Sequence, residues 1–549
     1  MAGDGRALRV LGIEGTAWAA SAAVYDATSD SVEMETEAYT PDSGGIHPRE
    51  AAEHMAEHLP AVVETVLERA RGEYGPDTAT GEDGESPVDA VAFSRGPGLG
   101  PCLRLTATSA RALAQRLDVP LVGVNHMVAH LEIGRHRSGF EDPVCLNASG
   151  ANAHVLGYRN GRYRVLGETM DTGVGNAIDK FTRHVGWSHP GGPKVERAAR
   201  DGEYIDLPYV VKGMDFSFAG ISSAAKEAYD AGTPVEDICC GLQETVFAML
   251  TEVSERALSL TGSEELVLGG GVGQNDRLQE MLASMCDQRD AAFFAPENRF
   301  LRDNAGMIAV LGAKMYEAGE TLAIEESAID SDFRPDEVPV TWRTDEGGSA
   351  TTPAAQAVVK GAEATVTVEG DRVRKRRKPR AYRHPALDER LRRKRTRGEA
   401  RLTSQARRAG VPTPLVYDID LERTQLVFQR VGDCELRAAV TPERVRQVAR
   451  HLARLHGAGL VHGDPTTRNV RVRTDGGEPA VFLIDFGLGY HSDDPEDHAM
   501  DLQVLAQSLT GTEDDADALV DAIEGAYRDA GDPAVLERLR DIETRGRYQ

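Results

Sequence analysis

Short apolar runs alternate with longer amphipathic stretches through the N-terminal part of the chain. Short apolar runs between polar or glycine-containing segments are typical of buried strands, and stretches of helical period predict helices. Strands are expected at Arg9–Gly12, Ala90–Phe93, Leu121–Val124, Val144–Asn147, His154–Tyr158 and Glu265–Leu268. Helices are expected at Pro48–Arg71, Thr106–Leu117, Val235–Leu260 and Asp303–Ala318. Residues 76–87, rich in Gly, Asp, Glu, Ser and Pro, predict a surface loop. The alternation indicates an α/β fold.

The pattern changes after this α/β region. Residues 334–356 carry the Pro, Gly, Ser and Thr content of a linker. The short β-rich segments Val358–Val359 and Ala364–Val368 follow, then a basic stretch expected to be helical, and further helix. This order is typical of a kinase small lobe that leads into a helical large lobe. We therefore expect domains at 1–333 and 357–549.

Charge and cysteine content favour a salt-rich, reducing cytoplasm. The chain has 88 acidic and 62 basic residues, a net charge of −26, and only nine of the basic residues are Lys. Carboxylates keep a surface hydrated while high salt screens their repulsion. Six Cys, two of them adjacent at Cys239-Cys240, are too few for a disulfide framework. No apolar stretch approaches the roughly 18 residues of a membrane span and no signal peptide is evident, so a cytoplasmic protein is expected.

One segment runs against the acidic composition. Residues 371–408, called here the basic strip, carry 17 Lys/Arg and four Asp/Glu, a net of +13 that leaves −39 for the remainder. A solvated helix face is one interpretation. We favour contact with a polyanion, because clustered Arg and Lys gain affinity by displacing counterions from phosphates.

Three residues near the C-terminus have the spacing of a kinase active site. Asp464 and Asn469 are five residues apart, and Asp485 ends the apolar run Val481–Ile484 and begins Asp-Phe-Gly. In kinases the first Asp orients the nucleophile as proton acceptor, while the Asn and the second Asp hold Mg²⁺ against the phosphates of ATP. Upstream, Lys375 can contact phosphate and Glu399 can orient that Lys, with the nearby Lys378 as the alternative to Lys375.

The same region departs from typical protein kinases. Gly361, Ala362 and Glu363 stand where a Gly-x-Gly-x-x-Gly loop is expected, and Gly463 replaces the Arg of His-Arg-Asp. Only 62 residues follow Gly487, and they contain no Ala-Pro-Glu. Little room remains for a platform that would bind a peptide substrate.

These motifs carry a family resemblance. Gly361–Ala364, Tyr382–Pro385, Thr396–Leu402 and His462–Asp464 resemble the small atypical kinase of the KEOPS complex, over about residues 357–549. The resemblance implies an ATPase that supports tRNA modification. It implies ATP contacts at Gly361, Ala362, Glu363, Lys375 and Glu399, and Mg²⁺ ligands at Asn469 and Asp485.

Three glycine loops follow apolar strands in the N-terminal part. They are Glu14-Gly15-Thr16, Ser149-Gly150-Ala151 and the segment from Gly269 to Asn275. Glycine lets backbone N–H groups approach a phosphate or a base without interference from a Cβ. One such loop is weak evidence, because tight turns use glycine anyway. Three of them suggest the actin-like ATPase architecture, with two related lobes around a nucleotide.

Two histidines in this region have the spacing of metal ligands. His126 and His130 are four residues apart, so on a helix they share one face and reach one ion, and Asp303 can add a carboxylate. Capping or surface histidines are the alternative. Met127 stands where the general-base Glu of a His-Glu-x-x-His peptidase would be, which disfavours peptidase activity.

Further polar residues cluster in the sequence between Asp171 and Glu196. Asp179 and Glu196 could accept hydrogen bonds from ribose hydroxyls, and Gly192 would admit the sugar closely. The alternative is that both acids are ordinary surface residues.

The N-terminal motifs also resemble one family. Val10–Ala17, Ser94–Arg104, His126–His130, His189–Glu196 and Gly269–Asn275 resemble the KEOPS threonylcarbamoyl transferase, over about residues 1–333. The resemblance implies an iron or zinc ion at His126, His130 and Asp303. It implies adenylate contacts at Asn147, Ala148, Ser149, Gly150, Ala151, Asp179, Gly192, Glu196 and Asn275. Archaeal relatives tend to have a Tyr metal ligand where this chain has Asn147, so Asn147 is a doubtful ligand.

Taken together, the two resemblances imply a natural fusion of transferase and kinase-like ATPase. Its expected activity is transfer of the threonylcarbamoyl group from threonylcarbamoyl-AMP to N6 of the adenosine beside the anticodon, in tRNAs that read codons beginning with A. Expected partners are tRNA, threonylcarbamoyl-AMP, ATP and other small KEOPS subunits, with no membrane and no DNA. The alternatives are a Ser/Thr protein kinase with a regulatory N-terminal domain, an RNA-binding scaffold and a metallopeptidase.

Overall fold

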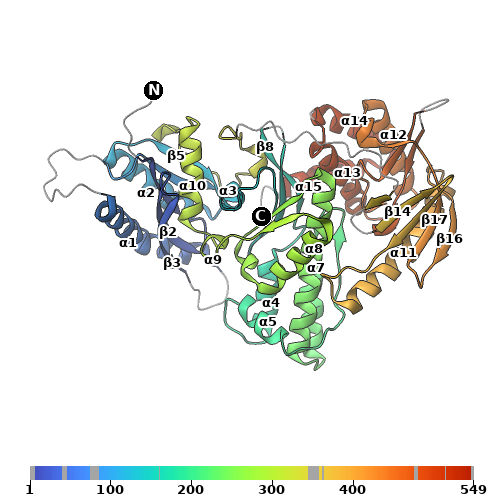
Figure 1. Ribbon diagram of the computed structural model, residues 1–549, viewed down its shortest axis with the longest axis horizontal. Coiled ribbons are helices and arrows are strands. Elements are labelled where there is room, and N and C mark those ends of the chain that lie inside the picture. Colours follow the sequence, from blue (N-terminus) through green and yellow to red (C-terminus); the bar gives the residue numbers. More distant parts are fainter. Residues whose placement is uncertain are drawn as a thin grey trace.

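The computed structural model describes most of the chain. The described ranges are 7–39, 46–74, 86–159, 161–343, 358–360, 364–474, 480–513 and 515–545. Most of the predicted loop 76–87 and the predicted ATP-binding residues Gly361, Ala362 and Glu363 lie outside these ranges. Within them, no helix combines the length and apolar character needed to cross a membrane. The N-terminal part, up to residue 343, and the C-terminal part, from residue 358, lie side by side (Figure 1).

The first lobe is a five-stranded sheet in the order β3-β2-β1-β4-β5. Its strands are β1 Arg9–Glu14, β2 Ala19–Asp26, β3 Ser31–Ala38, β4 Ala90–Gly96 and β5 Leu121–Asn125. Helices α1 Pro48–Tyr74 and α2 Gly100–Leu117 cover one face, and α3 His126–Ser138 and α10 Ala305–Glu317 cover the other. Both faces are buried, which is why the strand sequences are nearly continuous apolar runs.

The second lobe repeats this arrangement. Its sheet has the order β12-β11-β6-β7-β8. The strands are β6 Val144–Ala148, β7 Ala153–Arg159, β8 Arg162–Glu168, β11 Glu265–Gly269 and β12 Ala292–Phe294. In each lobe the first three strands are antiparallel, and two later strands add in parallel on the other side of the first. The shared topology is that of the two related lobes predicted from the glycine loops.

Helices and a small hairpin complete the second lobe. They are α4 Val174–His184, α5 Gly192–Ala199, α6 Ala219–Asp230, α7 Val235–Thr261, α8 Asp276–Arg289, α9 Asn298–Leu301, β9 Val211–Lys212 and β10 Asp215–Phe216. Two helices begin at other residues than predicted. α2 begins at Gly100, since Pro101 fits the first helical turn, and α10 begins after Asn304, whose side chain caps Met307 N–H. Asp303 therefore precedes α10 rather than lying inside it.

The described start of the predicted linker is a packed segment. Val340 N–H donates to the carbonyl oxygen of Gly161 at 2.8 Å, and Val338 and Val340 join the core of the N-terminal part. The guanidinium of Arg343 lies 3.6 Å from the ring centroid of Tyr158. Residues 334–343 thus pack on the N-terminal part, and the remainder of 334–356 lies outside the described ranges.

The C-terminal part begins with a five-stranded antiparallel sheet and one helix. The strands are β13 Val358–Lys360, β14 Ala364–Glu369, β15 Arg372–Arg377, β16 Val416–Asp420 and β17 Gln425–Gln429, and the helix is α11 Pro385–Arg408. The basic strip was predicted to be helical throughout, but it starts as strand β15, and β16 and β17 follow where further helix was expected. Side chains of a strand alternate between its two faces, and in β15 Lys375 and Arg377 are buried while Arg376 between them is exposed.

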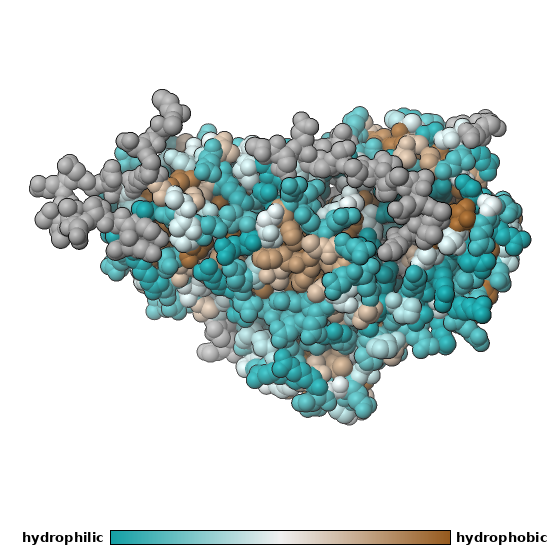
Figure 2. Space-filling model, in the orientation of Figure 1, coloured by the Kyte–Doolittle hydropathy of each residue, from teal (hydrophilic) through white to brown (hydrophobic). Residues whose placement is uncertain are grey.

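The remaining C-terminal elements form a mainly helical lobe. They are β18 Cys434–Glu435, α12 Pro442–His456, β19 Leu460–Val461, β20 Val470–Arg473, β21 Ala480–Leu483, β22 Tyr490–His491, α13 Pro495–Thr510, α14 Ala516–Ala530 and α15 Pro533–Arg545. The preceding sheet and α11 form one lobe and these elements form the other, which is the two-lobed arrangement expected of a kinase-like domain. On the face drawn in Figure 2 hydrophilic residues predominate, in keeping with the net charge.

Buried ion pairs join the two parts of the chain. Glu252 on α7 is 1 % exposed. It forms ion pairs with Arg383 and Arg395 of the basic strip, the latter at 3.0 Å. Glu255, one turn along, pairs with Arg380 at 3.1 Å and accepts from Tyr382 Oη at 3.2 Å. The basic strip was interpreted as a polyanion contact. For these three arginines that interpretation is wrong, because their partners are the chain's own buried carboxylates.

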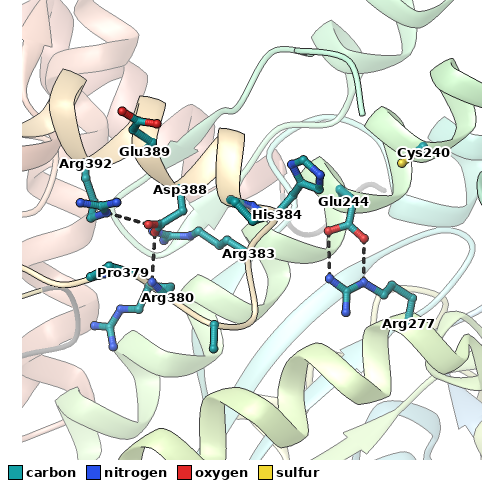
Figure 3. A pocket seen from close by; sticks show the side chains of 12 residues that line it. Cys240, Glu244, Arg277, Pro379, Arg380, Arg383, His384, Asp388, Glu389 and Arg392 are labelled. Atoms are coloured by element: carbon teal, nitrogen blue, oxygen red, sulfur yellow. Dashed lines mark hydrogen bonds and ion pairs between the residues drawn. The ribbon is translucent and has the colours of Figure 1, made fainter. Parts of the chain in front are cut away.

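A cavity of about 590 Å³ lies beside these ion pairs (Figure 3). One side comes from α7 and α8, where Arg277 makes a two-pronged contact with Glu244, at 2.6 and 3.0 Å. The other comes from the start of α11, where Asp388 accepts from Arg392 at 2.6 Å and from the Arg380 backbone N–H at 3.2 Å. The charged side chains that line this cavity have ion-pair partners among the described residues, and the cavity lies between α7 and α8 on one side and α11 on the other.

Candidate functional site

The predicted metal residues meet between the two lobes of the N-terminal part. Asn125 ends β5 and caps α3, so α3 starts at His126 and carries His130 on the same face. Asp303 comes from the segment before α10. Its Oδ1 lies 3.2 Å from His126 Nε2 and 3.1 Å from His130 Nε2, and the candidate ligand atoms all lie within 4.8 Å of one another.

Glu14 holds the first of these histidines in place. Its Oε2 lies 3.1 Å from His126 Nδ1, and its other oxygen accepts from the Thr16 backbone N–H and hydroxyl, at 2.8 and 2.6 Å. Ser94 Oγ also donates to the Glu14 carboxylate. A carboxylate behind a histidine fixes the ring so that the opposite nitrogen faces a metal. From the sequence, Glu14 was considered only as part of a glycine loop. The feature that could have indicated its role is an acidic residue at the end of a buried apolar strand.

The electrostatics of this cluster favour a cation. Burial by itself lowers the pKa of His126, but the carboxylates of Glu14 and Asp303 outweigh it and raise that pKa to about 10. For Asp303, burial is outweighed by the two histidines, and its pKa falls below the usual range. Burial dominates at His130 and lowers its pKa. The buried carboxylate of Glu14 and the partly buried carboxylate of Asp303 stabilise positive charge between them. Two imidazoles with one carboxylate are donors that suit iron or zinc.

Asn147 lies at the edge of this cluster. Its side chain is 1 % exposed, and its Nδ2 contacts Met127 Sδ at 3.5 Å. Among the described residues, Asn147 Oδ1 has no hydrogen-bond partner. Asn147 pairs with Gly269 across β6 and β11, and His130 also borders Gly269. An unpartnered amide oxygen here is available to a ligand of the site, although it is a weaker donor than a phenolate.

The predicted adenylate residues are linked into one rim. Asn147 and Ala148 end β6, and the loop Ser149, Gly150 and Ala151 follows them; Asn147 pairs with Gly269 at the end of β11. Gly150 O accepts from Asn176 N–H at 2.9 Å, which joins this loop to the start of α4. Backbone N–H groups at the carboxyl ends of parallel strands are where this class of fold binds nucleotides.

The rim continues through α4, α5 and α8. Asp179 Oδ1 accepts from Gly191 N–H at 2.8 Å, and Glu196 Oε1 accepts from Asp276 N–H at 3.0 Å. Around Gly192 nothing lies within 4 Å of where a Cβ would be. Asn275 Oδ1 caps α8 and its Nδ2 donates to Gln243 at 3.3 Å, so Asn275 also has a structural role.

The kinase-like site is assembled from both lobes of the C-terminal part. Lys375 Nζ on β15 lies 2.9 and 3.1 Å from the two carboxylate oxygens of Glu399 on α11, and 2.6 Å from Asp485 Oδ1. Asn469 Nδ2 donates to the backbone oxygen and to Oδ2 of Asp464, both at 2.9 Å. This is the arrangement expected of a site that holds Mg-ATP.

Asp501 on α13 supports the catalytic loop and was not singled out in the sequence. Its carboxylate accepts from the backbone N–H groups of His462 and Gly463, at 2.7 and 2.8 Å. It also lies 3.0 Å from His456 Nε2. Gly463 has a φ of +80°, and a Cβ there would lie 2.6 Å from Leu488 O. The backbone therefore explains why Gly replaces Arg in this loop.

A hairpin of the N-terminal part touches this catalytic loop. Gly213, between β9 and β10, donates its N–H to Gly463 O at 2.7 Å, and Lys212 pairs with Asp497. On its other side the hairpin contacts the segment that precedes α4. Met170 N–H donates to Phe216 O at 2.9 Å, and Asp171 accepts from the backbone N–H of Phe218 at 2.9 Å. The hairpin thus links the catalytic loop to the segment before α4, the helix whose start donates to Gly150 O.

Comparison with known proteins agrees with this geometry. A family model described as tRNA N6-adenosine threonylcarbamoyltransferase matches residues 29–310. The chain belongs to this family. A second model, the lipopolysaccharide kinase (Kdo/WaaP) family, matches residues 373–527. The N-terminal part is called the transferase domain below, and the C-terminal part the kinase-like domain.

Relatives of full length carry both domains in one chain. A protein of Haloarcula marismortui named "Probable bifunctional tRNA threonylcarbamoyladenosine biosynthesis protein" is 69% identical over 99% of this chain and 100% of its own. Proteins with the same name in Halobacterium salinarum and Methanospirillum hungatei are 68% and 51% identical, over 99% and 98% of this chain and 99% of their own in each case. The fusion implied by the two sets of motifs is confirmed.

Proposed function

We propose that the transferase domain moves the threonylcarbamoyl group of threonylcarbamoyl-AMP to N6 of the adenosine beside the anticodon, in tRNAs that read codons beginning with A. The observation that supports this is the position of His126, His130 and the partly buried Asp303 beside the glycine-loop rim. The names of the full-length relatives support the same reaction.

The rim and the cluster have separate tasks in this proposal. Backbone N–H groups of residues 147–151 stabilise the adenylate phosphate, and Asp179 and Glu196 accept from the ribose hydroxyls. An iron or zinc ion at His126, His130 and Asp303 would polarise or anchor the threonylcarbamoyl group. The N6 nitrogen forms a bond to the carbamoyl carbon, the bond from that carbon to the phosphate oxygen breaks, AMP leaves, and N6 loses a proton. Positioning supplies much of the rate, and no covalent intermediate on the protein is needed.

The kinase-like domain binds and hydrolyses Mg-ATP in support of this cycle. Lys375, oriented by Glu399, contacts the phosphates, while Asn469 and Asp485 hold Mg²⁺ and Asp464 orients the attacking water. The hairpin at Gly213 gives ATP hydrolysis a physical route to the adenylate rim. Other small KEOPS subunits are the expected partners, with tRNA as the common substrate, in the cytoplasm.

The transfer is tested by incubating purified protein and partner subunits with threonylcarbamoyl-AMP and tRNA. Nucleoside mass spectrometry should find N6-threonylcarbamoyladenosine and an equal amount of AMP, and both should vanish in a His126→Ala/His130→Ala variant. Unmodified tRNA in the presence of the intact complex would refute the proposal. The Asp464→Asn variant should lose ATPase activity while it keeps its affinity for the adenylate.

Protein phosphorylation is a second candidate function, favoured by the formed Lys375–Glu399 pair. That contact is required for phosphoryl transfer to any acceptor. Phosphate transfer to a protein that survives loss of His126 and His130 would favour it. The hairpin of the transferase domain at the catalytic loop argues instead for an ATPase.

A further inference from the structure

An open hollow of about 590 Å³ lies on the outer side of helix α5, next to the adenylate rim. Helices α4 and α5 lie at the lower edge of the molecule in Figure 1. The hollow is lined by Trp187 of the α4–α5 connection, by Lys194 and Arg197 of α5, and by one carboxylate, Asp201. An aromatic ring flanked by two cations is the composition of a site for a nucleotide of single-stranded RNA.

Helix α5 separates this hollow from the adenylate. At 3.6 residues per turn, Gly192 and Glu196 lie on one face of α5, whereas Lys194 and Arg197 lie on the opposite face. The proposed adenylate contacts and the hollow are therefore back to back across a single helix. An α-helix with its side chains is about 10–12 Å across, and this is the width that RNA has to span if one base lies at the adenylate and a neighbouring nucleotide lies in the hollow.

Trp187 is held in place before any ligand arrives. Its backbone N–H donates to Thr182 O at 2.8 Å, and the side chain packs on the core of the second lobe while it also lines the hollow. A ring fixed in this way loses little conformational entropy when a base stacks on it.

The two cations are available to phosphate. Lys194 Nζ donates to Ser188 O at 2.7 Å and to its hydroxyl, which directs the ammonium to the wall of the hollow. Arg197 is exposed and uses its Nε for Pro193 O at 3.2 Å. Within the described ranges, its terminal guanidinium nitrogens make no ion pair.

Local charge distinguishes this region from the rest of the protein. Residues 179–201 carry five Lys/Arg and three Asp/Glu, a net of +2, whereas the whole chain has a net charge of −26. Concentrated salt weakens phosphate contacts made by Lys and Arg, but base stacking is not screened. An aromatic platform is therefore the more effective element in the environment that the composition indicates.

We infer that this hollow binds a nucleotide that flanks the target adenosine in the tRNA anticodon loop, with its base stacked on Trp187 and its phosphate near Lys194 and Arg197. The inference rests on the proposed transfer reaction and adds the RNA contact that positions the acceptor. Trp187 is then a positioning residue, since it touches a neighbour of the reacting base.

The test compares Trp187→Ala, Trp187→Phe and Arg197→Ala with wild type, in the full chain with partner subunits. Stacking on one aromatic ring contributes enough for Trp187→Ala to raise the KM for tRNA roughly five- to 150-fold, with kcat at saturating tRNA and affinity for threonylcarbamoyl-AMP retained. Trp187→Phe should recover most of the affinity. Arg197→Ala should lower the slope of tRNA affinity against salt by about one, whereas Arg116→Ala, an exposed Arg on α2, should not.

The outcomes separate this inference from the proposed function. If wild type modifies tRNA and Trp187→Ala does so with an unchanged KM, the hollow does not bind RNA. Equal impairment of the Phe and Ala variants, with weakened adenylate binding in both, would mean that Trp187 only supports the fold, and this also overturns the inference. Failure of wild type to modify tRNA would instead count against the transfer reaction itself.

Discussion

The backbone N–H of Gly213 in the transferase domain lies 2.7 Å from the carbonyl oxygen of Gly463, the residue before Asp464 in the kinase-like domain. Arg256 Nη1 donates to the carbonyl oxygen of Gly213 at 2.7 Å, so the tip of the hairpin is fixed from both sides. The hairpin therefore connects the catalytic loop to the segment before α4, which leads into the adenylate rim.

The first prediction concerns this contact. Gly213 has a φ of +58°, and a Cβ there would lie 2.2 Å from Val504 Cγ2. Gly213→Ala should disfavour the docked hairpin by about 1–2 kcal/mol, roughly five- to thirtyfold, and reduce multiple-turnover tRNA modification accordingly. Single-turnover transfer should be retained. Both are measured by nucleoside mass spectrometry over time.

Gly319→Ala is the matched control for this variant. Gly319 has a φ of +83° but nothing within 4 Å of its Cβ position, so it has the backbone strain without the interdomain contact. Equal losses of turnover in the two variants would show that strain, and not the Gly213–Gly463 contact, is responsible.

Glu14 should set the metal affinity of the transferase domain. Glu14→Gln removes the negative charge behind His126, and loss of such a supporting carboxylate typically costs 10- to 100-fold in affinity. Titration with zinc or ferrous iron, with metal content measured after dialysis, provides the comparison. Glu37→Gln, an exposed carboxylate on β3, serves as the control. Unchanged affinity in Glu14→Gln would exclude this role.

Six strands were predictable from their apolar runs, whereas β2 was missed although all eight of its residues are buried, because its Ala-rich sequence lacks the large apolar residues typical of a strand. β1, β4, β5, β6, β7 and β11 lie within a few residues of the expected runs, because burial on both faces imposes an unbroken apolar sequence. β15 was missed, since its alternate Arg residues face solvent and only Lys375 and Arg377 turn inward. Period two among arginines is difficult to distinguish from a charged helix.

The candidate sites were predictable residue by residue, but their supporting groups were not. His126, His130 and Asp303 were chosen by chemistry and spacing, and they do meet. Glu14 contacts His126, and Asp501 contacts the loop at His462, each from a position far away in the sequence. Sequence spacing gives no sign of such contacts. The same is true of the basic strip, because only the fold shows that Arg383 and Arg395 meet Glu252.

Glu252 should be essential for docking of the two domains. Glu252→Ala leaves Arg383 and Arg395 buried without their carboxylate, and loss of one partner from a buried ion pair typically costs 3–5 kcal/mol. Differential scanning calorimetry should show a lower transition temperature of the kinase-like domain. Glu236→Ala, at an exposed position on α7, should leave that transition in place. An unaltered transition in Glu252→Ala would mean that the interface does not depend on this network.

Asp215 should make stability depend on pH. Burial, aided by the nearby Glu168, raises the pKa of Asp215 to about 8. The folded protein then binds more protons than the unfolded chain between about pH 4 and pH 8, so stability falls as pH rises through this window, by up to about 1.4 kcal/mol per unit. Asp215→Asn should remove most of this fall and raise the transition temperature at pH 8.

Thermal unfolding at pH 5 and pH 8 measures this effect. Asp287→Asn, an exposed Asp on α8, should reproduce the wild-type pH dependence. If Asp215→Asn also loses stability between these pH values as steeply as wild type, the carboxyl group of Asp215 is ionised in the fold and the prediction is wrong.

The most direct measurement is the number of tRNA molecules modified per protein when threonylcarbamoyl-AMP is supplied in excess, with ATP or with a non-hydrolysable ATP analogue. If the two active sites serve one cycle, ATP supports many turnovers and the analogue stops modification near one tRNA per protein. Equal turnover with ATP and with the analogue would contradict the coupling of the two domains.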